Sequence, residues 1–389
     1  MPKAVWLLII GMFINTTGNS FLWPLHTIYM TDYLGQSLPT AGLVLMLNAG
    51  TGVIGNLLGG YLFDRIGGFR AIITGIILSI LALIFLTFWN EWPEYIWLVA
   101  ILGFSGGLIF PSMYAMVGSV WPEGGRKAFN AIYLAQNVGV AIGPAIAGFV
   151  AENNIKHIFP ANLFAYVLFL GVAYIFYRKI SVPDATSTNM MPEETAFNLK
   201  APLYAMAIVT FGYMLTWMVY VQWTSTISTH ILDLGISLSE YSLLWTINGA
   251  LIIGLQPVIK PIIARMEGKL KSQMVLGLFI FMGSFIVVAY AESYAIFITA
   301  MAILTVGELF VWPAVPTLAS QLAPKGKEGF YQGIVNSMAT IGRMIGPLVG
   351  GALVEIYGTQ FMILILTSFV LISIITSFLY DLPLKKRAQ

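Results

Sequence analysis

One acid, Glu308, and one base, Arg343, lie inside long apolar stretches of the sequence, where ionisable side chains are rare. A charge at the centre of a membrane-spanning helix costs about 2.5–3.5 kcal/mol on insertion scales, so it usually faces a cavity or a partner. Both residues are equally far from the turn at 325–326, which places them at the same depth, about 26 Å along two antiparallel helices. The pattern predicts a carboxyl group that binds and releases protons, or a structural ion pair with Arg343, or both.

Polar and aromatic side chains recur at helical spacing in other apolar stretches. Asn15, Asn19, Leu22, His26 and Tyr29 follow steps of four and three residues, which place them on one helix face. Aromatic faces attract cations by about 0.5–2 kcal/mol each, and buried apolar area adds about 25 cal/mol per Å². The candidates for contact with a bound molecule are Asn15, Asn19, His26, Tyr133, Asn137, Tyr213, Trp217, Tyr220, Trp312 and Asn336.

Each of these candidates has ordinary packing as an equal alternative. For His26, a hydrogen-bonded structural histidine is favoured over one that titrates near neutral pH. A cavity that is rich in Trp, Tyr and Met and holds one acid suits amphipathic, often cationic, organic compounds. Sugars would need more convergent hydrogen-bonding groups.

The elements that must position these residues are apolar helices. Of the 389 residues, 58% are hydrophobic and 9% are charged, far below the quarter that is typical of soluble proteins. Apolar runs of this length predict transmembrane helices, because open strands leave backbone groups unsatisfied in lipid. We predict an all-α membrane protein with twelve spans, at residues 4–31, 40–63, 70–90, 95–121, 127–151, 158–178, 201–231, 240–264, 272–291, 294–322, 329–355 and 359–380.

The charges predict the orientation of these spans. Seventeen of the 19 Lys and Arg residues lie at one set of loop ends, whereas the opposite loops carry mostly Asp and Glu. The positive-inside bias therefore predicts a multi-pass protein of the plasma membrane with both termini in the cytoplasm. The sequence has no cysteine, which excludes thiolate catalysis, and it has no phosphate-binding loop. We expect no enzymatic activity, no cofactor, no metal and no nucleic-acid partner.

The two halves of the chain repeat. Pro111 and Pro313 are 202 residues apart, "GVAIGPAIAG" (139–148) matches "GRMIGPLVGG" (342–351), and Asn48 matches Asn248. We predict a six-helix bundle at 1–180, a cytoplasmic linker at 181–199 and a second six-helix bundle at 200–389. Such parallel repeats, with a site between the halves, are typical of major facilitator transporters, so we predict the major facilitator fold.

The loop "GGYLFDRIGGFR" (59–70) resembles the signature Gly-x-Leu-x-Asp-Arg-x-Gly-Arg-Lys of that superfamily. Gly68 and Phe69 depart from it, because the family usually has basic residues there. The resemblance implies a contact across the two halves with the eleventh span, which starts near residue 328, and that this contact holds an outward-open state; the alternative is a plain cytoplasmic turn. The signature residues are Gly60, Asp64, Arg65 and Gly67, with Arg70 just beyond.

Two glycine-rich segments resemble the Gly-Pro motif of the drug–proton antiporter branch. We expect both to be packing seams between the halves that re-form during a conformational change, since glycines four residues apart let helices approach closely. The residues are Gly139, Gly143, Pro144 and Gly148 in span five, and Gly342, Gly346 and Pro347 in span eleven.

The segment around Glu308 resembles the tenth span of LmrP-like multidrug antiporters. That resemblance implies that Glu308 takes part in proton coupling. Two departures stand beside it: Ile132 occupies the place of an acid expected in span five, and Asn15 and Asn19 replace the first-span acids of other drug antiporters.

The sequence therefore predicts a proton-coupled multidrug efflux antiporter that works by alternating access. Its expected partners are a small amphipathic organic substrate, protons and membrane lipid, and its expected state is a monomer. The alternative is a major facilitator exporter or flippase for lipid-linked or anionic metabolites, which are contacted mainly through Arg343. A channel is disfavoured because few charges line the spans, and a membrane sensor is disfavoured because such proteins usually carry a soluble output domain, which we do not find in the sequence.

Overall fold

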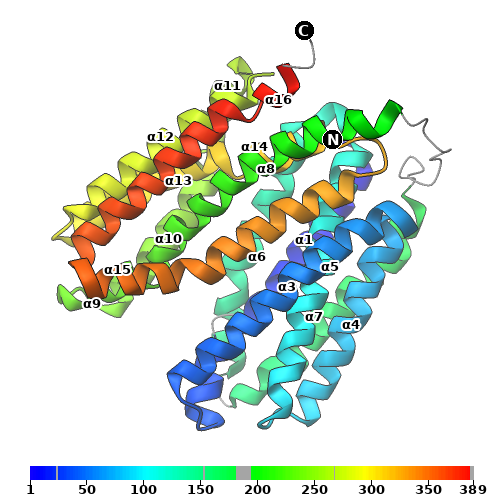
Figure 1. Ribbon diagram of the computed structural model, residues 1–389. Helices are drawn as coiled ribbons and strands as arrows, with labels where there is room; N and C mark the ends of the chain where they lie inside the picture. The colour runs from blue at the N-terminus through cyan, green and yellow to red at the C-terminus, as the bar shows by residue number, and fades with distance from the viewer. Residues whose placement is uncertain (23–24, 152–153, 181–193, 267, 386–389) are drawn as a thin grey trace. The chain divides into compact units, whose positions relative to one another are not determined.

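The computed structural model describes residues 1–22, 25–151, 154–180, 194–266 and 268–385. All regular secondary structure in these ranges is helical (Figure 1). Most of the predicted linker, 181–199, falls outside them. By its internal contacts the chain forms two compact units, Met1–Met190 with Ala323–Ser337, and Met191–Leu322 with Met338–Gln389.

The first unit is built mainly by α1 to α7. In it, α3 packs along α5, α1 lies against α6 and α7, and α4 lies against α5 and α7. Large buried aromatic side chains from α5 and α7, such as Tyr95 and Phe159, belong to its core. The bounds are α1 Lys3–Leu22, α2 His26–Ile28, α3 Leu38–Ile66, α4 Gly68–Phe88, α5 Glu94–Val120, α6 Arg126–Ala151 and α7 Ile158–Phe176, with a π-helix at Tyr29–Tyr33.

The second unit holds α8 to α14, α16 and most of α15. Here α13 packs against α12 and α10, and α8 packs against α14 and α16. The bounds are α8 Glu194–Tyr220, α9 Thr226–Asp233, α10 Leu238–Gly254, α11 Gln256–Arg265, α12 Leu270–Ala289, α13 Tyr294–Val311, α14 Ala314–Leu322, α15 Glu328–Leu379 and α16 Leu382–Lys385.

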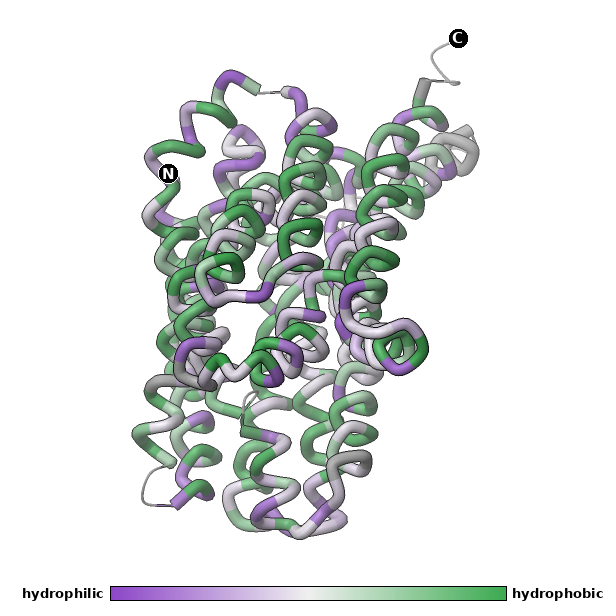
Figure 2. The backbone as a smooth tube through the Cα atoms, turned by 90° about the vertical axis from the view of Figure 1, so that its left-hand side faces the viewer, coloured by the Kyte–Doolittle hydropathy of each residue, from purple (hydrophilic) through white to green (hydrophobic). Residues whose placement is uncertain are grey.

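The described helices match the predicted spans. Ten of them are long and apolar enough to cross a membrane, and the bent pair Glu240–Gly254 and Gln256–Arg265 brings the number to eleven. The longest stretch, Glu328–Leu384, covers the last two predicted spans, and the chain turns inside it at Gly358, where φ is 78°. Hydrophobic residues run along most of the helices (Figure 2), as is needed where lipid offers the backbone no hydrogen bonds.

Candidate residues lie beside two helix ends. Helix α1 ends at Leu22 and α2 begins at His26, and the helix face predicted from Asn15 to Tyr29 crosses residues 23–24, which lie outside the described ranges. In the tenth span α13 ends at Val311 and α14 begins at Ala314. Pro313 lies at this break and lacks the N–H that would continue the helix.

Candidate functional site

Glu308 lies on α13 in the interior of the second unit. Only 1% of its surface is exposed. The Nδ2 group of Asn248, on α10, donates hydrogen bonds to Glu308 Oε1 at 3.1 Å and to Thr305 Oγ1 at 2.8 Å. The Tyr220 side chain, on α8, hydrogen-bonds to the Glu308 carboxyl group. The carboxyl group is thus turned inward and held by polar groups from α8 and α10.

An aromatic cluster adjoins this carboxyl group. We define it as Trp217 and Tyr220 on α8 with Trp312 at the end of α13. The rings of Trp217 and Trp312 stack with centroids 4.6 Å apart and planes 9° apart. Tyr220 meets Trp217 edge-on at 5.2 Å and Trp312 at 5.6 Å. Tyr213 and Phe281 also meet Trp312, at 5.4 and 6.0 Å.

Arg343 meets the same cluster from α15. Its guanidinium carbon lies 4.7 Å from the Trp217 ring centroid, and its Nη2 donates to Thr340 Oγ1 at 3.2 Å. The side chain is exposed. Tyr220 lies within electrostatic range of both Arg343 and Glu308. The structure therefore brings together six predicted residues of the second unit, namely Glu308, Arg343, Tyr213, Trp217, Tyr220 and Trp312.

The glycines of α15 bring Arg343 to this position. A Cβ atom on Gly342 would lie 2.4 Å from the Met214 carbonyl oxygen and 2.7 Å from Trp217 Cβ, so only glycine allows this approach to α8. Gly346 approaches Met218 in the same way. This seam joins two helices of the second half, whereas the sequence predicts a seam between the halves, so that prediction is wrong.

The glycines of the span-five motif also pack within their own half, and not between the halves as predicted. Gly139 and Gly143 lie against α1, where added Cβ atoms would meet Thr16 Cβ at 2.9 Å and Ser20 Cβ at 2.5 Å. Nothing in the described residues lies within 4 Å of a Cβ placed on Gly148. The reason is local: the flat glycine face turns to the neighbouring helix of its own half. Pro144 and Pro347 lie inside α6 and α15.

Asp64, at the end of α3, contacts the start of α15 within the first unit. Its two carboxylate oxygens accept hydrogen bonds from the backbone N–H groups of Gly329 and Phe330, each at 2.8 Å. These are among the first N–H groups of a helix, which have no partner within it. Gly60 lies beside them, and a Cβ on it would approach the Gly329 carbonyl oxygen to 2.1 Å. The contact predicted for Asp64 is present; its role in a conformational switch stays a prediction.

The other signature residues shape the turn after α3. Gly67 has φ 84°, a left-handed conformation that favours glycine, and it joins α3 directly to α4. Arg65 and Arg70 are exposed, and the Arg65 guanidinium carbon lies 5.5 Å from the Tyr61 ring centroid.

The candidates in the first unit do not form one site. Asn15 is buried, and its amide atoms have no hydrogen-bond partner among the described residues, whereas Asn19 is exposed. His26 is buried, and its Nδ1 lies 2.7 Å from the Tyr95 hydroxyl group, as the structural alternative predicts. Two further amides bond to backbone within their own helices: Asn137 Nδ2 donates to the Tyr133 carbonyl oxygen at 2.8 Å, and Asn336 Nδ2 to that of Gln332 at 2.9 Å.

Sequence reasoning did not assign Asn248 to the site. The available signal was its match to Asn48, whose Nδ2 donates to the Val99 carbonyl oxygen at 2.7 Å. At the repeat offset of 202 residues, Gly106 occupies the position of Glu308. The first half therefore has the amide but no carboxylate, and only the second half combines the two.

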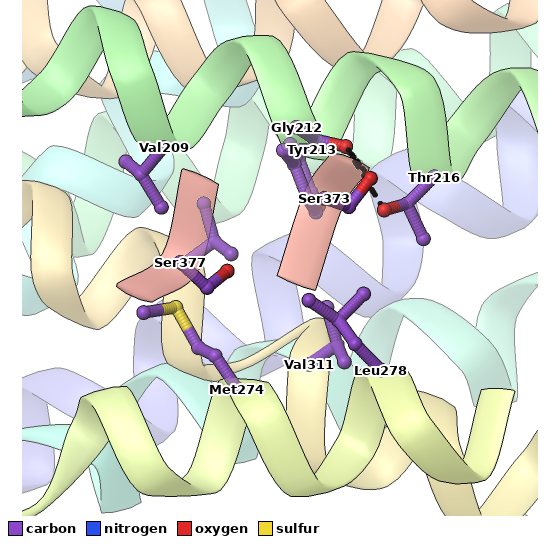
Figure 3. Close-up of a pocket in the computed structure, with 10 residues that line it drawn as sticks. Val209, Gly212, Tyr213, Thr216, Met274, Leu278, Val311, Ser373 and Ser377 are labelled. Atoms are coloured by element: carbon purple, nitrogen blue, oxygen red, sulfur yellow. Dashed lines mark hydrogen bonds between the residues drawn. The ribbon is translucent and has the colours of Figure 1, made fainter. Parts of the chain in front are cut away.

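A small cavity lies beside the aromatic cluster in the second unit. Ser373 and Thr216 both donate to the Gly212 carbonyl oxygen at its wall, at 2.7 and 2.9 Å (Figure 3). Val311 and Leu278 line it as well. Its volume is ≈ 10 Å³, which is about the space that one water molecule needs. This cavity is too small for an organic ligand.

A bundle of membrane-length helices with an inward-facing acid and aromatic groups is the architecture of a membrane transporter. The profile of the Major Facilitator Superfamily matches residues 8–342 and 206–389. The chain is 53% identical to the MFS-type transporter YttB of Bacillus subtilis, whose function is uncharacterized, over 100% of this chain and 98% of that protein. The chain belongs to the Major Facilitator Superfamily.

More distant relatives carry functional names. A Na⁺, Li⁺, K⁺/H⁺ antiporter of Planococcus maritimus is 26% identical, over 95% of this chain and 94% of that protein. The quinolone resistance protein NorA of Staphylococcus aureus is 24% identical, over 92% and 91%. The crystal structure of the human organic anion transporter MFSD10 matches with a TM-score of 0.78 at 14% identity, over 97% and 100% of the two chains, which shows the shared fold. The protein is a multi-pass MFS-type transporter and not an enzyme.

Proposed function

We propose that this transporter exports amphipathic, often cationic, organic compounds in exchange for protons, and that Glu308 is the proton-coupling group. The observation that carries the proposal is the carboxyl group of Glu308, buried among polar partners beside the aromatic cluster. A buried carboxylate attracts a proton or a cation, and indole faces attract cations as well. The names of two relatives, one a cation/H⁺ antiporter and one a quinolone resistance protein, support the same class.

The proposed cycle is alternating access. With Glu308 protonated, the site opens to the cytoplasm; loss of the proton accompanies binding of the compound, and release outside precedes reprotonation. One proton exchanged for one monovalent cation moves no net charge. The driving force is then the pH gradient alone, about 1.4 kcal/mol per pH unit. Exchange of a proton for a neutral compound would move one charge, so the membrane potential would add about 2.3 kcal/mol per 100 mV.

The proposed setting is the plasma membrane, with a monomer as the working unit and both termini in the cytoplasm. The asymmetry of the basic residues supports this orientation. The contact between Asp64 and the start of α15 would act as the conformational switch, because it must form and break as the transporter changes state.

The test is uptake of the lipophilic cation tetraphenylphosphonium into acid-loaded proteoliposomes. Protons leaving the vesicles should drive accumulation of the cation, about tenfold for one pH unit at one-to-one exchange. Glu308→Gln should abolish this accumulation, and Glu292→Gln, a change at an exposed acid of the same unit, should leave it intact. Accumulation by Glu308→Gln that still follows the pH gradient would refute the scheme.

A second candidate is transport of anionic compounds with Arg343 as the main contact. The observation that favours it is the exposed Arg343 guanidinium over the Trp217 ring. Parallel uptake of an anionic dye separates the two candidates. Uptake of the anion but not of the cation, lost in Arg343→Gln, would establish the second and remove the first.

A further inference from the structure

The Trp217 ring has two close neighbours. Trp312 stacks on it with its ring centroid 4.6 Å away. The Arg343 guanidinium carbon lies over the same ring, 4.7 Å from the Trp217 centroid. The guanidinium therefore adjoins the stacked indole pair.

The part of the Trp217 ring that Arg343 covers is the place in the cluster where a cation would bind best. Indole has the most attractive face of the aromatic side chains, and Trp312 extends it to a stacked pair. The Tyr220 ring meets Trp217 at 79°, and the Tyr213 ring meets Trp312 at 80°, so the two tyrosines flank the stacked indoles. The Arg343 guanidinium therefore occupies the position over Trp217 that a cationic ligand would take.

The guanidinium is placed there by packing and by a hydrogen bond, at the end of an exposed side chain. Gly342 fixes the backbone of α15 against Trp217, as described above, and Thr340 orients Nη2. The side chain itself is exposed, so water can solvate the guanidinium when it swings away.

We propose that Arg343 is an internal competitor for the cationic substrate and sets the charge selectivity of the site. A ligand cation binds by displacing the guanidinium from Trp217, so compounds with a weakly hydrated, bulky cation are selected over small hydrated ones. A neutral compound does not need this face and does not compete. The inference rests on the proposed function, because it concerns the substrate of that same site.

The test compares two isosteric probes, phenylbutyl-trimethylammonium and its neutral tert-butyl analogue. Equilibrium dialysis against the purified full chain gives a Kd for each. Arg343→Gln should tighten binding of the cation by about 2- to 30-fold, the range of one cation–π contact, and leave the neutral analogue unchanged. Arg343→Lys should give a smaller gain, because ammonium keeps the charge but is more strongly hydrated and has no flat face. Arg265→Gln, which removes an exposed base elsewhere in the same unit, is the matched control and should change neither Kd.

The variant Trp217→Leu separates competition for the ring from simple charge repulsion. In its background, Arg343→Gln should give no gain in cation affinity. The inference is overturned if Arg343→Gln still tightens cation binding in the Trp217→Leu background, or if it does not tighten cation binding when Trp217 is present. If Arg343→Gln does not purify as a monodisperse protein, an unchanged cation Kd for Arg343→Lys also overturns the inference. The proposed function is tested separately, by transport of tetraphenylphosphonium with the pH gradient in the wild-type protein. If that transport is seen, failure of the inference leaves the proposed function intact. Failure of that transport removes the proposed function, and the inference with it.

Discussion

The contact between Asp64 and the first turn of α15 makes a quantitative prediction. Each of its two N–H···O⁻ bonds is 2.8 Å long, within the range of charge-assisted hydrogen bonds. Hydrogen bonds to charged groups contribute about 1.5–3 kcal/mol each, and a negative charge at a helix N-terminus adds about 0.3–1 kcal/mol. Asp64→Asn removes the charge but keeps one oxygen that can accept, so it should lose about one such bond.

Hydrogen exchange of the Gly329 and Phe330 amides is the direct assay. Opening of this turn should become about 10- to 100-fold more frequent in Asp64→Asn, since each 1.4 kcal/mol is a factor of ten. Asp64→Ala removes both acceptors and should accelerate exchange further. The matched control is Glu123→Gln, an exposed acid in another loop of the same unit, which should leave exchange at these amides unchanged.

An unchanged exchange rate in Asp64→Ala would refute the reasoning. It would mean that these two amides are protected by something other than the carboxylate. Equal acceleration in Asp64→Asn and Asp64→Ala would instead show that the negative charge, and not the number of acceptors, carries the stabilisation.

Three further changes test a close helix contact, a buried hydrogen bond and an ion pair. Gly60→Ala places a Cβ 2.1 Å from the Gly329 carbonyl oxygen and should lower the free energy of unfolding by about 1–3 kcal/mol, which is seen as a lower thermal midpoint in detergent. The control is Gly106→Ala, whose added Cβ has nothing within 4 Å among the described residues. This control should raise the thermal midpoint slightly or leave it unchanged. Tyr95→Phe removes the partner of the buried His26 Nδ1 and should cost about 1–3 kcal/mol, again read as the thermal midpoint; an unchanged midpoint contradicts the bond. Lys271 lies 2.8 Å from an Asp381 oxygen with both side chains partly exposed, so Lys271→Met should cost only about 0–1 kcal/mol, and a loss that does not shrink in high salt would contradict an ionic origin.

Sequence patterns predicted the spans well because hydropathy is a local property. Every predicted span has a helical counterpart in the described residues, including the two that merge across Gly358. The inward position of Glu308 was also predictable, since a charge that faced lipid would be too costly. The α8 residues Trp217 and Tyr220 came together as expected because steps of three and four residues define a helix face.

Contacts between helices were predicted less well. The glycine seams of α6 and α15 lie against α1 and α8 of their own halves, although a glycine pattern alone says only that some helix approaches closely. Asn248 reaches Glu308 from 60 positions away, and no spacing rule connects residues on separate helices.

The sequence by itself determined that the chain is a bundle of membrane helices with one deeply placed acid and one deeply placed base, because lipid accepts few charges and no unpaired backbone. Only the tertiary structure decided that Asn248 and Tyr220 hold the acid and that the base lies over the Trp217 ring. Such contacts depend on how helices rotate and cross, and these angles are set by side-chain packing over many residues at once.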